Sequence, residues 1–294
     1  MGIHDDATVR ARELGNALRE IREAADLTLR GLAAILHWSP SKLSMLETGK
    51  RCASEVDVAM ILASCGVFGG DLKRLMALAR QTDDSYRLRP HNQWLPAELR
   101  SLIVHESTAT SITSFDPLVL PGLLQTEAYA RAIFHWIGLL PEEDLNLRVE
   151  ARLARQSLLR RPNPPECTFF IHENALRTMI GGPEIMDEQI LHLLALSSKP
   201  HCAIRVVPRS AGPFGALGGS FRVMRYADAP PVVYADTLAA GVFFEERWDV
   251  TAYNGLMGRV GKGGLDGGQS REWLATLANH YHRARSQPDD PRAP

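Results

Sequence analysis

Small polar and basic side chains dominate the stretch WSPSKLSMLETGKR, residues 38–51. Ser39 is a favourable N-cap, and Pro40 suits the first position of a helix, where its missing N–H is not needed. At about 100° per residue, Leu43 and Leu46 share one side of this helix. The opposite side carries Ser41, Ser44, Met45 and Thr48, with Lys42 on the flank. The hydroxyl groups on that side can donate and accept hydrogen bonds at base edges or phosphates.

Cations accompany this helix. From Thr28 to Arg51 there are four cations, Arg30, Lys42, Lys50 and Arg51, against the single acid Glu47. The formal net charge of the 294-residue chain is −1, so nucleic-acid binding would have to come from this local basic patch. The alternative is a helical packing module whose third helix is polar on its outer side.

Helical patterns on both sides position this stretch. The preceding segment TLRGLAAILHW has Thr28 as N-cap and ends at 37–38, so two helices are separated by a short turn, as in a helix-turn-helix. Three further helices are predicted from apolar spacing and capping residues: one around Leu14 to Ala25, one from Ser54 to Gly66, and one over 71–81. The first 82 residues are therefore expected to form an all-α, five-helix helix-turn-helix domain.

The segment LGNALREIREAADLTLRGLAAILHWSPSKLSMLETGKR resembles the lambda-repressor and Cro, or xenobiotic-response-element, type of helix-turn-helix. The resemblance implies that Glu47 helps to fix the end of the recognition helix. It also implies DNA contacts at Thr28, Ser39, Ser41, Lys42 and Ser44. Many relatives carry glutamine at the start of the second and third helices, where this chain has Leu29 or Arg30 and Ser39 or Pro40. The base preference of those relatives is therefore not assigned to this chain.

The remaining chain changes character. Residues 83–95 are polar and lack a regular period, which indicates a linker. Residues 96–285 predict an α+β domain with a small sheet flanked by helices, and 286–294 predict a disordered tail. Helices are expected at 96–110, 126–137, 142–160, 173–180, 184–197, 246–260 and 270–285. Strands are expected at 167–172, 202–207, 219–226, 232–236 and 241–245.

Two groups of residues in this second domain are candidate ligand or partner contacts. Leu123, Leu124 and Gln125 follow the turn Pro121-Gly122, although the leucines could equally belong to the core. The second group, on one predicted helical stripe, could receive an acidic partner, a phosphate or a carboxylate, or could form a solvated face paired with nearby glutamates. This group comprises Arg148, Arg152, Arg155 and, a turn later, Arg160, with Gln156 adjoining.

Enzymatic chemistry is not predicted. Glu173 follows a predicted strand and is a candidate ligand contact, although it more simply caps the next helix. The segment GRVGKGGLDGG, 258–268, lacks the order of a phosphate-binding loop and is expected to be a flexible connection. The ten histidines show no metal-ligand spacing, so neither a cofactor nor a metal is expected.

Composition is that of a globular protein, with 45% hydrophobic and 23% charged residues. The four cysteines have no C-x-x-C spacing and are expected to be buried free thiols in a reducing compartment. The N-terminus has no signal-peptide core, and no apolar stretch approaches the ~20 residues of a membrane span. A cytoplasmic, nucleoid-associated location is expected.

The second domain resembles the C-terminal domain of actinobacterial WhiJ-like regulators. The segments that carry this resemblance are LVLPGLLQTEAYARAI, RLARQSLL, FFIHENALRTMIGGPEIMDEQILHLL, IRVVP and GSFRVMRYADAPPVVYADT. It implies a role in development, antibiotic production or toxin–antitoxin-like pairs, often with a small acidic protein encoded nearby.

The sequence therefore predicts a sequence-specific transcriptional regulator that binds promoter or operator DNA as a homodimer. Its second domain is expected to sense a small acidic protein or a small-molecule effector. The alternative is an antitoxin-like protein whose main task is to bind the small acidic partner, with autoregulatory DNA binding.

Overall fold

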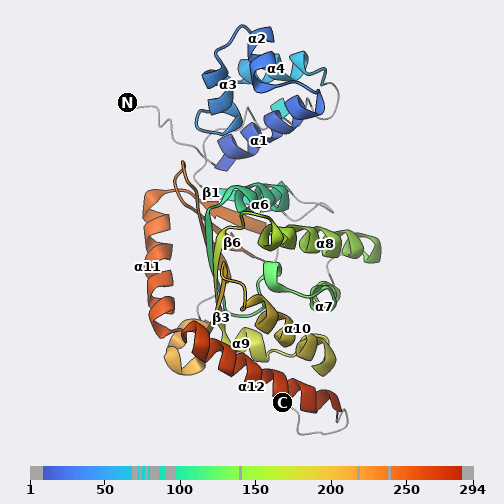
Figure 1. Cartoon of the computed structure of the whole chain (residues 1–294), viewed down its shortest axis with the longest axis vertical. Helices are drawn as coiled ribbons and strands as arrows, with labels where there is room; N and C mark the ends of the chain where they lie inside the picture. Colours follow the sequence, from blue (N-terminus) through green and yellow to red (C-terminus); the bar gives the residue numbers. More distant parts are fainter. Residues whose placement is uncertain are drawn as a thin grey trace.

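A helical domain stands on a larger α+β domain in the computed structural model (Figure 1). The structure describes residues 9–67, 72, 75–76, 79, 86–90, 97–138, 141–216, 219–237 and 240–286. The predicted multidomain fold class, an all-α domain followed by an α+β domain, is confirmed. The predicted tail, 286–294, lies outside the described residues apart from Ser286, the last residue of the final helix.

Local capping defines the helices of the first domain. They are α1 (Val9–Ala24), α2 (Leu29–Ile35), α3 (Pro40–Glu47) and α4 (Glu55–Ser64). The three predicted N-caps, Thr28, Ser39 and Ser54, are confirmed, and Ser54 forms a reciprocal capping box with Asp57. Of the predicted fifth helix, Leu72, Leu75, Met76 and Ala79 are helical, and its other residues lie outside the described part.

The helical domain has its own core. Leu18, Leu32, Leu43 and Ile61 are completely buried and belong to one apolar cluster. α1 and α3 approach closely at Gly15, where an added Cβ would lie 2.3 Å from the carbonyl oxygen of Leu46. The two leucines predicted to anchor α3, Leu43 and Leu46, are 0% and 1% exposed. The outer side of α3 is therefore fixed in direction by core packing.

The second domain contains one sheet with helices on both faces. Within the described residues its elements are β1 (Tyr86–Pro90), α6 (Ala97–Thr108), β2 (Ser111–Asp116), η1 (Gly122–Leu124), α7 (Glu127–Ile137), α8 (Glu142–Arg155), η2 (Gln156–Arg160), β3 (Glu166–His172), α9 (Glu173–Arg177), α10 (Pro183–Leu196), β4 (Cys202–Val207), η3 (Arg209–Ala211), η4 (Pro213–Ala216), β5 (Phe221–Arg225), β6 (Val232–Asp236), β7 (Ala240–Phe244), α11 (Arg247–Gly263) and α12 (Gly267–Ser286).

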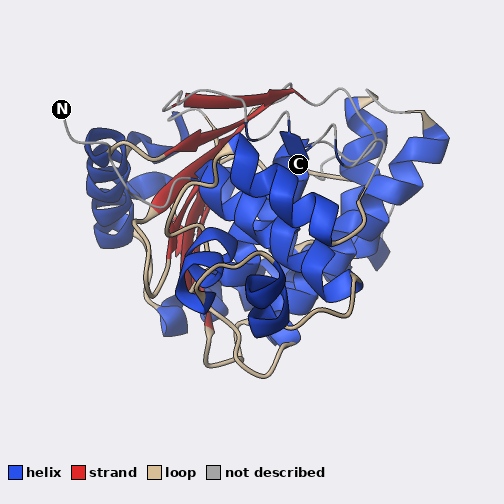
Figure 2. Cartoon of the chain, turned by 90° about the horizontal axis from the view of Figure 1, so that it is seen from above, coloured by secondary structure: helices blue, strands red, loops and turns tan. Residues whose placement is uncertain are grey.

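Seven strands of the described chain form a mixed sheet in the order β1-β7-β6-β5-β2-β3-β4. β2, β3 and β4 are parallel, and the remaining neighbours pair antiparallel. Figure 2 shows α11 on one side of the sheet and most other helices of this domain on the other side. The larger core cluster includes Ile112 and Phe169, whereas Phe115 and Phe170 pack on the α11 side with Val260.

Three sequence expectations differ from this fold. The segment predicted as a linker contains β1, which pairs with β7 at the sheet edge. β2 was not predicted, although it is central in the sheet between β5 and β3. The glycine-rich segment predicted as a flexible connection is helical up to Gly263, and α12 begins four residues later at Gly267. Exposed glycines at 255 and 258 are tolerated because α11 packs through Val250, Met257 and Val260.

Candidate nucleic-acid interface

α3 presents the predicted contact residues outward. Ser41, Met45 and Thr48 are exposed, and Lys42 and Ser44 are half-buried. Before and after α3, the other predicted contacts are also exposed: Thr28, Arg30, Ser39, Lys50 and Arg51. All ten predicted residues therefore lie at or near the surface around one short helix, as a groove-binding helix requires.

Several hydroxyl groups of this surface also hold the local structure. The Ser39 Oγ accepts a hydrogen bond from the Lys42 amide at 3.1 Å, and the Thr28 Oγ1 accepts one from the Gly31 amide at 3.0 Å. Thr48 donates from its hydroxyl to the Ser44 carbonyl at 2.7 Å. These hydroxyls retain acceptor capacity for a further partner, since an oxygen of this type has two lone pairs.

Lys42 is held in place by its neighbours. Its Nζ lies 2.7 Å from Asp57 Oδ1 and 3.6 Å from the centre of the Trp38 ring. Partial burial of Asp57 opposes ionisation, but hydrogen bonds from Lys42 and Ser54 outweigh it and lower the pKa of Asp57. Asp57 therefore already neutralises part of the Lys42 charge that a phosphate would contact, which the sequence did not indicate.

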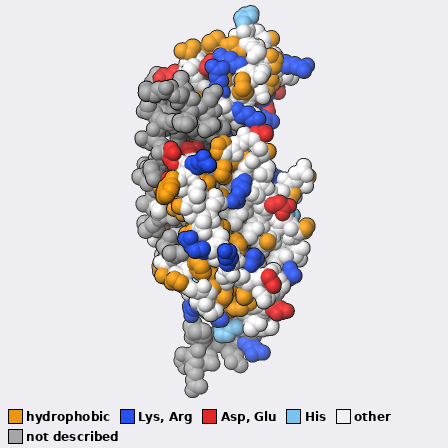
Figure 3. Space-filling view, turned by 90° about the vertical axis from the view of Figure 1, so that its left-hand side faces the viewer, with side chains coloured by type: hydrophobic (Ala, Val, Ile, Leu, Met, Phe, Trp, Pro, Cys, Tyr) orange, Lys and Arg blue, Asp and Glu red, His pale blue; other side chains and the backbone are white. Residues whose placement is uncertain are grey.

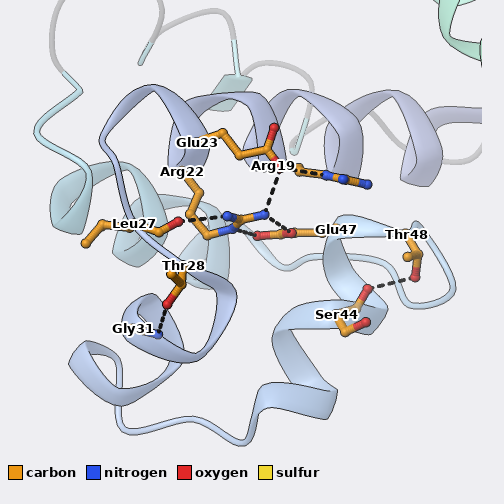
Figure 4. A network of polar contacts seen from close by, with 9 residues as sticks. All are labelled: Arg19, Arg22, Glu23, Leu27, Thr28, Gly31, Ser44, Glu47 and Thr48. Atoms are coloured by element: carbon orange, nitrogen blue, oxygen red, sulfur yellow. Dashed lines mark hydrogen bonds and ion pairs between the residues drawn. The ribbon is translucent and has the colours of Figure 1, made fainter.

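A buried ion pair fixes the end of α3 (Figure 4). Arg22 of α1 donates from Nε to Glu47 Oε1 at 2.7 Å and from Nη2 to Glu47 Oε2 at 3.0 Å. Arg22 also donates to the Leu27 carbonyl at 2.8 Å, which ties in the turn before α2. The hydrogen bond to Glu47 raises the pKa of Arg22. The role that the resemblance gave to Glu47 thus has a structural counterpart, whereas its partner Arg22 was not identified from the sequence.

The basic turn after α3 rests on a left-handed glycine. Gly49 has φ of +68°, and an added Cβ would meet the backbone of Arg12 at 2.6 Å. Only glycine fits this close approach without strain. Lys50 and Arg51 follow with exposed side chains, and Lys50 Nζ lies 3.2 Å from the carboxylate of Asp228 in the second domain.

The predicted contacts around Pro121-Gly122 are internal. Leu123 and Leu124 are 1% and 0% exposed, so they belong to the core and do not line an open surface. Gln125 is also buried, where it donates to the Leu120 carbonyl at 2.7 Å and accepts from Arg152 at 2.8 Å. Gln156 donates to the Gln125 carbonyl at 2.7 Å. The burial agrees with the alternative that the leucines belong to the core, because η1 packs against α8 and α10.

The predicted arginine stripe is divided among internal partners. Arg155 forms two hydrogen bonds to Glu106 of α6, at 2.9 and 2.8 Å, and Arg222 of β5 adds a third at 2.6 Å. Burial of Glu106 favours its neutral form, but these two arginines outweigh the burial and lower the pKa of Glu106. Arg152 stacks on Phe134 with 4.3 Å between the guanidinium carbon and the ring centre. Arg148 is half-buried.

Two acids near the ends of parallel strands differ in environment. Asp116, at the end of β2, is 2% exposed and accepts from the Ser114 hydroxyl at 2.6 Å. Burial raises the pKa of Asp116 to about 6. Glu173, after β3, accepts from the Arg209 amide at 2.9 Å and from Arg177 at 2.7 Å. Glu173 therefore joins the loop after β4 to α9.

Other sequence expectations concern metals, membranes and thiols. Across the described residues, no group of three or more His, Cys, Asp or Glu side chains is placed to hold a metal ion. No helix in the described ranges is long and apolar enough to cross a membrane. The cysteines are free thiols; Cys167 and Cys202 are buried as expected, whereas Cys52 is exposed, contrary to expectation.

The basic character extends beyond the helical domain. α11 carries Arg247, Arg259 and Lys262 with exposed side chains. Figure 3 views the side of the molecule on which α11 lies, and Lys and Arg side chains are distributed down the middle of this face. Acidic side chains are fewer than basic ones in that view, so the charge of the visible side chains on this face favours phosphate.

Comparison with known families gives two matches. Residues 13–76 match the family described as a helix-turn-helix domain. Residues 99–276 match the family described as a domain of unknown function, DUF5753. No curated protein and no solved structure matched this chain.

Proposed function

The chain belongs to the DUF5753 family, and for this member we propose a sequence-specific DNA-binding transcriptional regulator with a helix-turn-helix reading domain. The observation that carries the proposal is α3, whose two leucines are buried while its small polar side chains face outward beside Arg30, Lys50 and Arg51. A recognition helix needs this combination of a fixed orientation and a shallow polar surface.

In the proposed complex, Ser41 and Ser44 contact base edges and the nearby cations contact phosphates. Ser41 is exposed in the first turn of α3, from which recognition helices contact bases. Arg30 and Arg51 are exposed at the two ends of the α2–α3 unit, where they can reach the DNA backbone. The proposal assigns no catalytic step to the chain.

The finer proposal is that the protein is an Xre-type regulator of the WhiJ-like kind that acts as a homodimer. One recognition helix reads only a few base pairs, so two half-sites about one helical turn apart would supply affinity and specificity. The second domain would provide dimerisation and respond to a small acidic protein or small-molecule effector. Supporting this division, that domain has its own core and sheet, distinct from the core of the helical domain.

The decisive experiment is selection of binding sites by the full-length protein from a random pool of duplexes, followed by fluorescence anisotropy at one fixed salt concentration. We expect an enriched sequence with two-fold symmetry, bound at least about a thousandfold more tightly than scrambled DNA. Ser41→Ala should change the base preferred at one position in each half-site. Equal affinity for selected and scrambled duplexes would refute a sequence-reading function.

A further inference from the structure

The first turn of α1 packs into the second domain. Val9 is completely buried within the larger core cluster of the second domain, and its amide donates to the carboxylate of Glu245. Arg12, one turn later, is 7% exposed. Its guanidinium carbon lies 3.9 Å from the centre of the Tyr226 ring, just after β5. The two domains are therefore joined by buried contacts in addition to the chain connection.

The Tyr226 ring that Arg12 contacts is held in place by its own neighbours. The Tyr226 hydroxyl and His105 Nδ1 are 2.8 Å apart, and His105 is completely buried in α6. The next residue, Glu106, is bound by Arg155 and Arg222. Tyr226 is thus held by a helix that is itself anchored to the sheet and to α8, so its ring has little freedom to follow a moving Arg12.

Arg12 is nevertheless poorly satisfied. Its Nε, Nη1 and Nη2 are buried, and although Tyr226 is close enough to stabilise the charge, none of the three atoms makes a hydrogen bond of good geometry within the described part of the chain. Burial lowers the pKa of Arg12, and Tyr226 and Glu245 only partly offset this effect. A buried cation without well-formed hydrogen bonds is unfavourable even when an aromatic ring faces it. The contact therefore contains a penalty that would be relieved if the domains separated and water reached the guanidinium.

The same contact engages a predicted phosphate-binding side chain. Lys50 Nζ lies 3.2 Å from Asp228, two residues after Tyr226 in the turn between β5 and β6. Lys50 follows Gly49, whose backbone is seated against Arg12. Movement of the turn away from Arg12 would therefore also release Lys50. The ammonium group of Lys50 has three donors, but the Asp228 carboxylate neutralises part of its charge and repels a phosphate at the same place, so Asp228 and the DNA backbone compete for Lys50.

We propose that the β5–β6 turn is an autoinhibitory contact in which Asp228 pairs with Lys50, and in which the packing of the Arg12 side chain against Tyr226 holds the turn in place while the buried Arg12 charge weakens that hold. The proposal rests on the DNA-binding function proposed above and adds how the second domain restrains it. In the closed arrangement Asp228 neutralises part of the Lys50 charge, and its exposed carboxylate adds negative charge next to the turn that follows the recognition helix. Opening the contact frees one cation and removes this repulsion.

The test measures DNA affinity of full-length Asp228→Asn, with Glu272→Gln as a matched control that removes one exposed negative charge from α12. We expect Asp228→Asn to bind selected and scrambled duplexes about 3- to 10-fold more tightly and to steepen the salt dependence by about one ion. Glu272→Gln should behave as wild type. If wild type binds its site specifically and Asp228→Asn matches Glu272→Gln in affinity and salt slope, the autoinhibitory contact is refuted.

A second pair of variants tests the stack independently. Arg12→Met removes the unsatisfied cation but keeps much of its volume, so it should close the contact, slow hydrogen exchange in the turn around Tyr226, and weaken DNA binding. Tyr226→Ala should open the contact, speed hydrogen exchange in the turn, and strengthen DNA binding. Effects of the same sign from both variants would overturn the proposal. Absence of sequence-specific binding in wild type and every variant would instead refute the proposed function, and the contact proposal with it.

Discussion

Replacing Glu47 with alanine should destabilise the helical domain selectively. The substitution removes two hydrogen bonds of 2.7 and 3.0 Å and leaves Arg22 buried with its charge uncompensated. Breaking a buried pair from one side costs about 3–5 kcal/mol. The lower value is expected here because Arg22 keeps the Leu27 carbonyl at 2.8 Å and Glu23 at 3.3 Å.

A loss of about 3 kcal/mol corresponds to a more than 100-fold increase in the population of the locally unfolded domain. Hydrogen exchange of the full-length protein, analysed by mass spectrometry, measures this directly. Peptides covering α1 to α3 should exchange about 100-fold faster in Glu47→Ala, whereas peptides covering β3 and β4 should not change. Glu20→Ala, on the exposed side of α1, is the control and should change exchange by no more than about threefold.

A double variant separates the ion pair from general damage. Arg22→Met with Glu47→Leu replaces both charged partners with apolar groups, which is often neutral for a buried pair. Exchange from α1 to α3 should then return to within about tenfold of wild type. If Glu47→Ala accelerates exchange less than tenfold, or if the double variant is as unstable as the single one, the assigned role of this pair is refuted.

Three further outcomes are expected. The pKa of Asp116 is raised from 3.8 to about 6, so the proton on Asp116 stabilises the fold fully below about pH 4, and this stabilisation is lost as pH rises through 6. In urea unfolding, the free energy of unfolding of Asp116→Asn should therefore increase by about 3 kcal/mol relative to wild type between pH 4 and pH 7. Arg51→Gln should weaken binding to specific and scrambled DNA by a similar factor and reduce the salt slope by about one, unlike Arg283→Gln on α12. Gly15→Ala should cost about 2 kcal/mol or more in thermal unfolding because its Cβ would meet the Leu46 carbonyl oxygen at 2.3 Å, whereas Gly255→Ala, with open space around it, should be neutral or stabilising.

The helical domain was predictable because its signals are local. Thr28, Ser39 and Ser54 cap helices through bonds to amides three residues away, and a short sequence window contains both partners. The direction of α3 followed from Leu43 and Leu46 for the same reason, since a regular helix converts spacing into a face. The second domain had fewer such signals. β2, with the sequence SITSFD, places Ser114 and Asp116 towards the interior, so its polar residues concealed a central strand.

The arginine stripe shows how a correct local pattern can give the wrong role. Residues 142–160 were predicted as one helix, but α8 ends at Arg155 and a 3-10 segment follows, so the angular relation beyond that point changes. More importantly, the acid that binds Arg155 lies 49 residues earlier, in α6. Nothing in the spacing of the arginines distinguishes a solvent-facing stripe from one that neutralises a buried carboxylate.

Sequence separation therefore decides which polar groups can be interpreted before the fold is known. Glu47 and Arg22 are 25 residues apart, Glu106 and Arg222 are 116 apart, and Arg12 meets Tyr226 only across the two domains. In each case one partner is an ordinary charged or aromatic residue on a predicted helix or strand, and nothing in the sequence around it indicates which residue it will contact. These long-range pairs are also the contacts that join α3 to α1, α6 to the sheet, and one domain to the other. The residues that the sequence assigns to DNA contacts lie on the surface, whereas those that set the position of that surface become identifiable only when the chain is folded.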